Sequence, residues 1–375
     1  DGEPLPPVFA ARGACRTSRR PSCCGGEPDW PGNPEARWRL LALARGLGLP
    51  MPRPFRVPYL PGLTVLIPHY GESILMLKGE LYGGDEKRER RVPLIDWVNA
   101  HYADEFRAFA ARQRARPGGR DWPAVGSPWG AYSEEQWGRL CTWASMRMQT
   151  LWRTVAGVCL YHPALQCHYE AQADRLSCLA RPGVWDPGDC FTCLVSMQMY
   201  RSFDGAQLAQ TDRMLEKFPA SLRVAFIDSE ERNINAEADR VHPRQRRRYF
   251  SCLLDRACPR LPDGRRAPRW RVELPGYPVL GDGKGDNQNH ALPFARGALV
   301  QLVDANQGGY FEQALLLPCL LGEFRAAGGG RGGRQGGAAQ RIVGLPEHIT
   351  SGMGSVGDFA ASAEHAFGTI LQRSY

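Results

Sequence analysis

The hydrophobic residues of this chain fall into short apolar runs and longer amphipathic stretches. Three runs rich in β-branched residues have the length of strands buried on both faces of a sheet: Leu63–Ile67, Phe191–Met197 and Leu222–Ile227. Helical spacing marks Asn33–Leu49, Leu94–Ala110, Ser133–Gln149 with a continuation to about Tyr161, and Asp204–Phe218. Ser133 with Gln136 also matches a capping box. The alternation of strands and helices predicts an α/β fold, a mostly parallel sheet with helices on both faces.

Polar residues follow each predicted buried strand. Tyr70 and Glu72 come just after the first strand, Gln198 follows the second, and the third runs into the acidic segment Asp228–Glu231. Carboxylates gathered at the carboxyl end of a strand are typical of a general base or a metal ligand. Acidic residues also gather in solvated loops, so both interpretations of this segment stay open.

The segment from Arg271 to Glu312 carries the strongest chemical signal. Two apolar runs, Arg271–Leu274 and Ala298–Val303, are each followed by a polar turn, and ligands bind beyond the carboxyl ends of strands in open α/β sheets. The first turn, Gly281–His290, contains glycines that let the backbone approach a bulky anion, and Lys284 supplies a point charge for phosphate. The second turn is Asp304-Ala305-Asn306-Gln307. The segment therefore predicts a phosphate-type ligand site.

The glycine turn does not match the better known phosphate loops. A Walker A loop has Gly-Lys followed by Ser or Thr, whereas Gly285 follows Lys284 here and Pro278 stands where the first glycine belongs. A dinucleotide fingerprint opens a helix, but Pro293 and another apolar run follow too soon. A solvated hairpin loop would explain the glycines but not the unbroken polar run from Asp286 to His290.

Several segments resemble one protein family. The runs LGDGKGDNQNH and QLVDANQGGYFEQAL, in this order and separation, together with TVLIPHYGE and MRMQTLWRTVAGV, closely resemble the 1,3-β-glucan synthases, which include the callose synthases of plants and algae and the glucan synthases of fungi. The resemblance implies a nucleotide-sugar glycosyltransferase (GT-A-like) fold. It also implies transfer of glucose from UDP-glucose to the 3-hydroxyl of a growing β-1,3-glucan, with inversion, on the cytosolic face of the plasma membrane.

The resemblance suggests roles for the polar residues. Tyr70 would stack on uracil, Glu72 would hold the uridine or ribose, and Gln198 fits the family pattern near the donor. Lys284 with Arg153 would stabilise the diphosphate leaving group, and the base would be Glu230, Glu231 or Asp228. The remaining candidates would grip glucose hydroxyls or the acceptor end: Asp286, Asn287, Asp304, Asn306 and Gln307.

Composition and charge exclude some classes of protein. The net charge of +8 comes mostly from dispersed arginines without a zinc-finger or RNA-binding signature, which does not favour nucleic acid. The 12 cysteines of a 375-residue chain without a recognisable signal peptide fit reduced thiols better than a secreted disulfide framework. No apolar stretch is long enough to span a bilayer, because the longest candidate, Leu151–Leu165, is interrupted by Arg153, His162 and Pro163.

Domain organisation follows from the same features. We expect residues 1–32 to be a disordered or poorly packed extension and residues 33–375 to be a partial catalytic domain with a flexible Gly-rich insertion at 327–338. Family members carry membrane helices on both sides of this region. The implied partners are UDP-glucose, the β-1,3-glucan chain, the flanking membrane domain and, as a candidate regulator, a small GTPase.

Two points stay open at the level of sequence. Many related transferases bind Mg or Mn through an Asp-x-Asp pair, and this chain has none, so the cofactor is undetermined. Ser229 replaces an acidic residue of the family pattern. The alternatives to a synthase are therefore a nucleotide-sugar-binding regulatory module and an inactive paralogue.

Overall fold

The computed structural model describes residues 62–83, 92–167, 191–231, 342–343, and 247–315 apart from 282, 298, 306, 308 and 310. Of these, the residues up to Phe311 belong to one compact unit and the few that follow belong to another. The predicted extension 1–32, the predicted helix Asn33–Leu49 and the Gly-rich insertion 327–338 lie outside the described residues.

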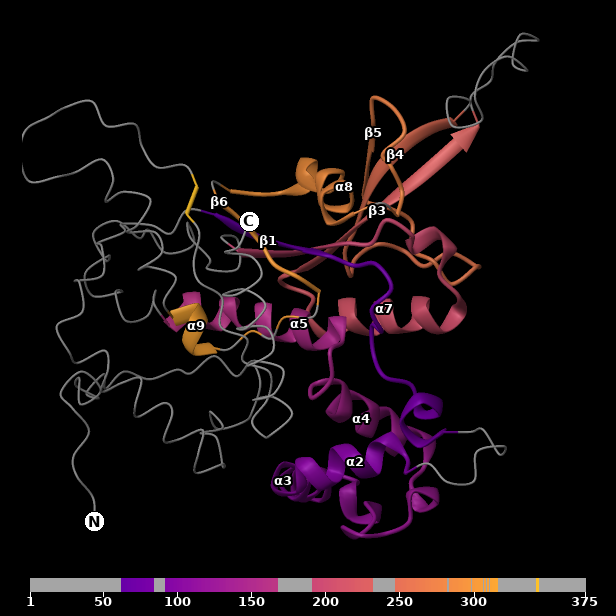
Figure 1. The fold of residues 1–375 in the computed structure, drawn as a ribbon, viewed down its shortest axis with the longest axis vertical. Coiled ribbons are helices and arrows are strands. Elements are labelled where there is room, and N and C mark those ends of the chain that lie inside the picture. Colours follow the sequence, from indigo (N-terminus) through magenta and orange to yellow (C-terminus); the bar gives the residue numbers. More distant parts are fainter. Residues whose placement is uncertain are drawn as a thin grey trace, which may run out of the picture. The chain divides into compact units, whose positions relative to one another are not determined.

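A six-stranded mixed sheet forms the centre of the larger unit (Figure 1). Its strands are β1 (Leu63–Pro68), β2 (Phe191–Ser196), β3 (Leu222–Glu231), β4 (Arg247–Leu254), β5 (Trp270–Glu273) and β6 (Leu299–Leu302), in the order β5-β4-β3-β2-β1-β6. β1 pairs in parallel with β2 and β6, and β2 pairs in parallel with β3. β4 is antiparallel to both β3 and β5, so the other five strands all point the same way. The predicted α/β fold is thus confirmed, with one reversed strand.

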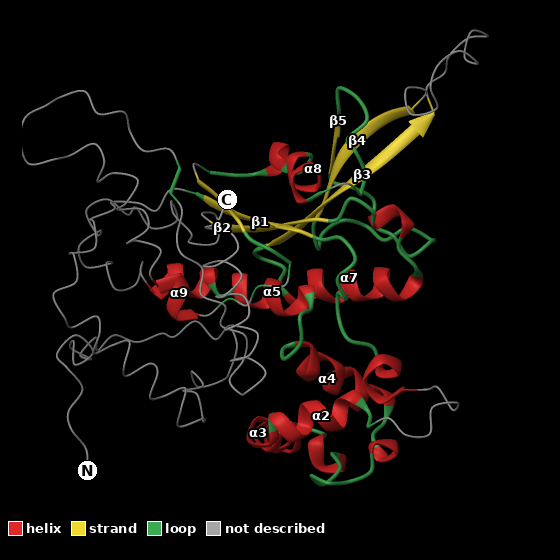
Figure 2. Ribbon diagram, viewed as in Figure 1, coloured by secondary structure: helices red, strands yellow, loops and turns green. Residues whose placement is uncertain are grey.

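Helices lie on both faces of the sheet (Figure 2). On one face lie α5 (Leu151–Val158) and α7 (Gly205–Lys217), and on the other lie α8 (Lys284–Asn289) and the 3-10 turn η8 (Leu292–Phe294). A separate helical group comprises α2 (Leu94–His101), α3 (Ala103–Arg114) and α4 (Glu134–Ser145). Other described helices are short: η1 (Gly79–Gly83), η2 (Gly119–Asp121), η3 (Trp129–Ala131), η5 (Tyr200–Ser202) and α9 (Phe311–Leu315). Residues 161–167 are helical as well.

Burial on both faces of the sheet explains why the central strands are unbroken apolar runs in the sequence. All six residues of β1 are buried, and β2 is buried apart from Thr192, which is half-buried. Towards α8, a cluster joins successive strands to the segment after that helix through Leu66, Leu194, Ala225, Leu253, Ala291 and Phe294. Towards α7, Phe226 packs on Tyr200, with 5.0 Å between ring centroids. A central strand covered on both faces needs apolar side chains in both directions.

The long helix predicted from Ser133 to Tyr161 is wrong, because two helices occupy the segment. The capping box is confirmed: Gln136 N donates to Ser133 Oγ and Ser133 N donates to Gln136 Oε1. α4 ends at Ser145, and α5 starts afresh after Thr150, whose side chain accepts from Arg153 N. No glycine or proline marks the break.

Two other element boundaries differ from the prediction. The helix expected over Leu94–Ala110 is divided at Tyr102 into α2 and α3. The third strand does not stop at Ile227 but continues to Glu231, because β4 supplies pairing partners, with Glu231 opposite Arg247 and Glu230 opposite Arg248. Opposite charges on facing residues support the longer ladder.

The glycine turn also behaves differently from the prediction. Its second half forms α8, a helix of six residues that begins at Lys284. The expectation that Pro293 leaves no room for a helix was wrong, because α8 ends before Pro293, which occupies an early position of η8. Proline is tolerated there because the first residues of a helix need no N–H donor.

Within the described ranges, no helix is both long and apolar enough to cross a bilayer.

α5 makes a close backbone contact with the segment after β6, through Gly157 and Gly309. A Cβ atom added to Gly157 would lie 2.3 Å from Gly309 N and 2.5 Å from Gly309 Cα. We expect Gly157→Ala to destabilise the protein by about 1–3 kcal/mol, the usual cost of overpacking. Gly138→Ala in α4 is the matched control, because its Cβ would meet only Arg213 Nη1, at 3.8 Å. Thermal unfolding should show a lowered midpoint for the first variant and an unchanged or raised midpoint for the second.

Candidate functional site

The candidate site lies where β1, β2 and β6 end. These neighbouring parallel strands run in the same direction, so the polar segments that follow them meet at one edge of the sheet. Tyr70 and Glu72 follow β1, Gln198 follows β2 and Asp304 follows β6. α8 covers this end of the sheet, and its Gln288 Nε2 donates to Leu66 O of β1 at 3.4 Å. The structure therefore brings four predicted site segments to one edge.

Lys284 and Asp304 form an ion pair at this edge. Lys284 Nζ lies 2.6 Å from Asp304 Oδ1, and the two side chains are 58% and 42% exposed. Gln307 closes the turn that carries Asp304: its Oε1 accepts from Asp304 N at 3.1 Å, and its own N donates to Asp304 O at 3.3 Å. The two predicted polar turns are thus joined by a salt bridge that solvent, or a ligand, can reach.

Buried polar groups hold α8 on the sheet. Ser196 Oγ, at the end of β2, lies 2.8 Å from both Asn287 Oδ1 and His290 Nε2. Ser251 Oγ of β4 lies 3.0 Å from His290 Nδ1 and donates to His290 O at 2.7 Å. Asn287 Nδ2 donates to His69 O at 2.8 Å. This buried network fixes the helix that carries Lys284.

Burial keeps the two histidines of this region neutral at pH 7. Loss of solvation lowers the pKa of His290 to about 4. Burial also lowers the pKa of His69, opposed by the hydrogen bond that its ring makes to the Glu72 backbone carbonyl and by the Glu72 charge. A neutral ring offers one donor and one acceptor nitrogen, so His290 can hydrogen-bond to Ser196 through Nε2 and to Ser251 through Nδ1.

The segment after β1 is a tight turn. His69 Nε2 lies 2.9 Å from Glu72 O, and Tyr70 N donates to Glu72 Oε2 at 2.8 Å. One oxygen of the Glu72 carboxylate, which is predicted to bind ribose, therefore accepts a hydrogen bond within its own loop. The role of Tyr70 in stacking on uracil stays a prediction.

Gln198 links β2 to the glycine turn. Its Oε1 accepts from Gly281 N at 3.1 Å, and the residue is only 3% exposed. Its Nε2 group has no hydrogen-bond partner among the described residues. Buried polar groups are nearly always paired, so this buried amide nitrogen is an unsatisfied donor next to the glycine turn.

Arg153 lies in α5, a helix that hydrogen-bonds to the loop after β1 and to the loop after β6. In the first turn of α5, Trp152 N donates to Ile74 O at 3.0 Å, and Leu151 N donates likewise to Ser73 O. One turn on, Thr154 Oγ1 donates to Ala305 O at 2.7 Å. Arg153 thus lies on the segment that joins the loop after β1 to the loop after β6, and its role at the donor stays a prediction.

The acidic run at the end of β3 is divided between the two faces of the sheet. Side chains alternate along a strand, so Asp228 and Glu230 share the face of Phe226, whereas Ser229 and Glu231 share the α8 face of Ala225. Asp228 Oδ1 lies 2.6 Å from Arg201 Nη1, and Arg271 Nη2 lies 2.5 Å from Glu230 Oε1. The sequence suggested one cluster, but two of its carboxylates are neutralised by arginines on the face opposite α8.

The other predicted residues occupy different environments. Asp286 is half-buried in the first turn of α8, Asn287 is fully buried in the network, and Asn306 lies outside the described residues. Sequence reasoning did not find Ser196 and Ser251, because a serine within an apolar strand gives no sign of its partner on a distant helix.

A metal site is not evident in the part of the chain that the structure describes. Within it, no three His, Cys, Asp or Glu side chains gather so that they could hold a metal ion. Two carboxylates at this edge already have partners: Asp304 pairs with Lys284, and Glu72 accepts from Tyr70 N. The cofactor therefore stays undetermined.

The depressed pKa of His290 predicts how stability depends on pH. An unfolded histidine takes up a proton near pH 6.5, whereas the buried ring does so only near pH 4. The stabilising contribution is therefore fully present above pH 6.5 and is lost as the pH falls towards 4, by about 3 kcal/mol in total. His290→Gln should show a shallower decline of the unfolding midpoint between pH 7 and pH 4.5. His101→Gln, an exposed histidine, is the control, and an equal decline in all three proteins would contradict the prediction.

Comparison with known proteins places the chain in a family. The family model for the 1,3-beta-glucan synthase component matches residues 30–121 and 120–375. The chain is 31% identical to the 1,3-beta-glucan synthase component FKS1 of Aspergillus niger, over 96% of the chain and 21% of that protein. It is 30% identical to callose synthase 7 of Arabidopsis thaliana, over 92% of the chain and 17% of that protein.

A third relative, callose synthase 9 of Arabidopsis thaliana, is 32% identical over 92% of the chain and 17% of its own length. The chain thus spans about a fifth of the length of the curated relatives it matches. With the family model covering most of its residues, this chain belongs to the 1,3-beta-glucan synthase component family.

Proposed function

We propose that this chain forms the sugar-transfer site of a 1,3-β-glucan synthase, which moves glucose from UDP-glucose to the 3-hydroxyl of a growing β-1,3-glucan with inversion, on a GT-A-like fold. The observation that carries the proposal is the solvent-accessible Lys284–Asp304 pair beyond the carboxyl ends of β1 and β6. Family membership supports the product, because the matched relatives are named as 1,3-beta-glucan and callose synthases.

The diphosphate of the donor would bind at Lys284. A Cβ atom added to Gly283 or Gly285 would meet nothing within 4 Å, so both sides of the lysine face open space. Gly281 has a φ of +79°, a conformation that favours glycine and turns the chain into α8. An ammonium beside the leaving group stabilises the negative charge that develops on UDP as the glycosidic bond breaks. Arg153 would assist Lys284 at the diphosphate, and Gln198 would orient the glycine turn through its contact with Gly281 N.

Binding of a diphosphate would also release a base. An inverting transfer needs a group that takes the proton of the acceptor hydroxyl. When phosphate oxygens replace Asp304 at Lys284, the Asp304 carboxylate loses its cation and becomes available as an acceptor. Asp304 is therefore favoured over Asp228 and Glu230, which are paired with arginines, while Glu231 on the α8 face remains the second candidate.

The setting of this chemistry is part of the proposal. The chain would act at the cytosolic face of the plasma membrane, and the flanking membrane domain of the full-length protein would carry the product away. A small GTPase is the candidate regulator. The alternative, a regulatory or inactive paralogue that binds the nucleotide sugar without turnover, is favoured by one observation, the neutralisation of Asp228 and Glu230 by arginines.

Synthesis by the full-length protein tests the function directly. Membranes that carry it are incubated with labelled UDP-glucose, and the product is digested with a β-1,3-specific glucanase. We expect labelled polymer that the glucanase degrades completely. Binding of UDP without synthesis of any polymer would instead support the alternative, a paralogue that binds the nucleotide sugar without turnover.

Lys284→Ala should lower the rate of polymer synthesis on the order of a hundredfold or more, because a preorganised charge at the leaving group is removed. The unfolding midpoint should change little, since the lysine is exposed. Lys217→Ala, an exposed lysine at the end of α7, is the matched control. Near-normal synthesis by the Lys284 variant would refute its role.

Asp304→Asn should also lower synthesis by roughly a hundredfold or more, the usual contribution of a general base. UDP should still bind to this variant, because Lys284 is retained. The matched control is Asp263→Asn, an exposed aspartate paired with Arg265. If Glu231→Gln loses activity while Asp304→Asn keeps it, the base belongs to the end of β3.

A further inference from the structure

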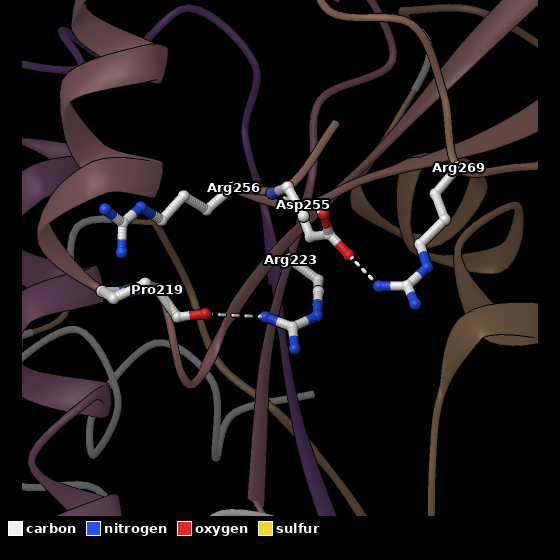
Figure 3. A pocket seen from close by; sticks show the side chains of 6 residues that line it. Pro219, Arg223, Asp255, Arg256 and Arg269 are labelled. Atoms are coloured by element: carbon white, nitrogen blue, oxygen red, sulfur yellow. Dashed lines mark hydrogen bonds and ion pairs between the residues drawn. The ribbon is translucent and has the colours of Figure 1, made fainter. Parts of the chain in front are cut away.

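A second polar hollow lies at the opposite edge of the sheet from the candidate transfer site. Its volume is about 410 Å³, and it is lined by Pro219, Arg223, Asp255, Arg256, Ala257 and Arg269 (Figure 3). We call it the arginine hollow. None of these residues belongs to the site described above.

Topology separates the two sites. The arginine hollow lies where β3 begins at Leu222, β4 ends at Leu254 and β5 begins at Trp270. The candidate transfer site lies beyond the other ends of the parallel strands. With a rise of about 3.3 Å per residue, a strand of six residues keeps the two edges about 20 Å apart. One ligand of the size of a sugar nucleotide cannot occupy both.

Arg223 is held in place by backbone carbonyls. Its Nη1 donates to Leu222 O at 2.7 Å and to Pro219 O at 3.3 Å. Its Nε and Nη2 groups form no hydrogen bond with the described residues. Burial lowers the pKa of this guanidinium, and the charges of Arg296 and Arg269 lower it further, whereas Asp255 raises it. Arg223 is thus a fixed, half-buried cation among other cations.

The only carboxylate lining the hollow is already engaged. Asp255 is 4% exposed, and its Oδ2 accepts from Arg269 Nη1 at 2.6 Å, while its Oδ1 accepts from Ala257 N at 2.8 Å. The Arg256 side chain forms no hydrogen bond or ion pair with the described residues, and in Figure 3 it extends to one side of the hollow. Three guanidiniums and one carboxylate leave an excess of positive charge among the lining residues.

We propose that the arginine hollow binds a phosphate-type anion, either a free phosphate or diphosphate or the phosphate of a lipid headgroup. The planar guanidinium, with donors in a fixed fork, matches phosphate oxygens better than an ammonium does. Mutual repulsion of neighbouring cations raises the free energy of the empty site, and an anion relieves it. The proposal does not depend on the transferase function, because it uses none of the residues of that site.

Binding of radiolabelled inorganic pyrophosphate to the purified full-length protein tests this proposal. The measurement is made on the wild type and in a Lys284→Ala background, in which the candidate transfer site is disabled. Arg256→Gln is the key substitution, since this side chain supports no contact with the described residues. In the Lys284→Ala background we expect it to weaken binding at least about tenfold, because a hydrogen bond to a charged group contributes about 1.5–3 kcal/mol. In the wild-type background it should weaken one of two binding sites and leave the other unchanged.

Two further variants separate a local effect from a general one. Ala257→Glu places a carboxylate at an exposed position of the hollow and should weaken binding as Arg256→Gln does. Arg120→Gln removes the same charge from an exposed position in η2 and should leave binding unchanged. An unchanged unfolding midpoint for each variant shows that the fold is intact.

Competition identifies the source of the phosphate. Displacement of pyrophosphate at lower concentration by inorganic phosphate indicates a free anion, and displacement at lower concentration by soluble dibutanoyl phosphatidic acid indicates a lipid headgroup. Absence of pyrophosphate binding in the Lys284→Ala background, or binding there that Arg256→Gln and Ala257→Glu leave intact, overturns the proposal.

Discussion

The candidate site depends on a small polar network buried in an otherwise apolar interface. Ser196 and Ser251 reach His290 from two strands of the sheet, and Asn287 joins Ser196 to the backbone of His69. Buried polar groups are costly unless they are paired, so α8 can sit on the sheet in only one register. That register determines where Lys284 emerges, and hence its contact with Asp304.

Charge is distributed unevenly over the two faces and two edges of the sheet. On the face of α7, the arginines of β5 and η5 neutralise the carboxylates at the end of β3. At the carboxyl edge, Lys284 is balanced by a single exposed aspartate that an anionic ligand can replace. At the opposite edge, the arginine hollow holds more cations than acids. This distribution supports the two separate anion sites proposed above.

Backbone contacts over long sequence separations shape the elements around the site. α4 and α5 would form one helix on local preference alone, but Leu151 and Trp152 donate to the loop after β1. A helix gains little from continuing past Ser145 when its next turn can bond to a distant loop instead, because tertiary contacts outweigh local propensity. The break brings Arg153 and Thr154 to the carboxyl edge, and the contact of Gly157 with Gly309 secures α5 there.

The sequence by itself determined the α/β class, the buried strands, the capping box of α4 and the polar segments that follow β1, β2 and β6. These features depend on periodicity and on residues close together in the chain, which is why they can be recognised without coordinates. Only the tertiary structure decided that Asp228 and Glu230 turn away from α8, that Asp304 faces Lys284, and that Ser251 reaches His290. Each of these depends on strand order and register, which bring together residues 20 to 41 positions apart and leave no periodic signal in the sequence.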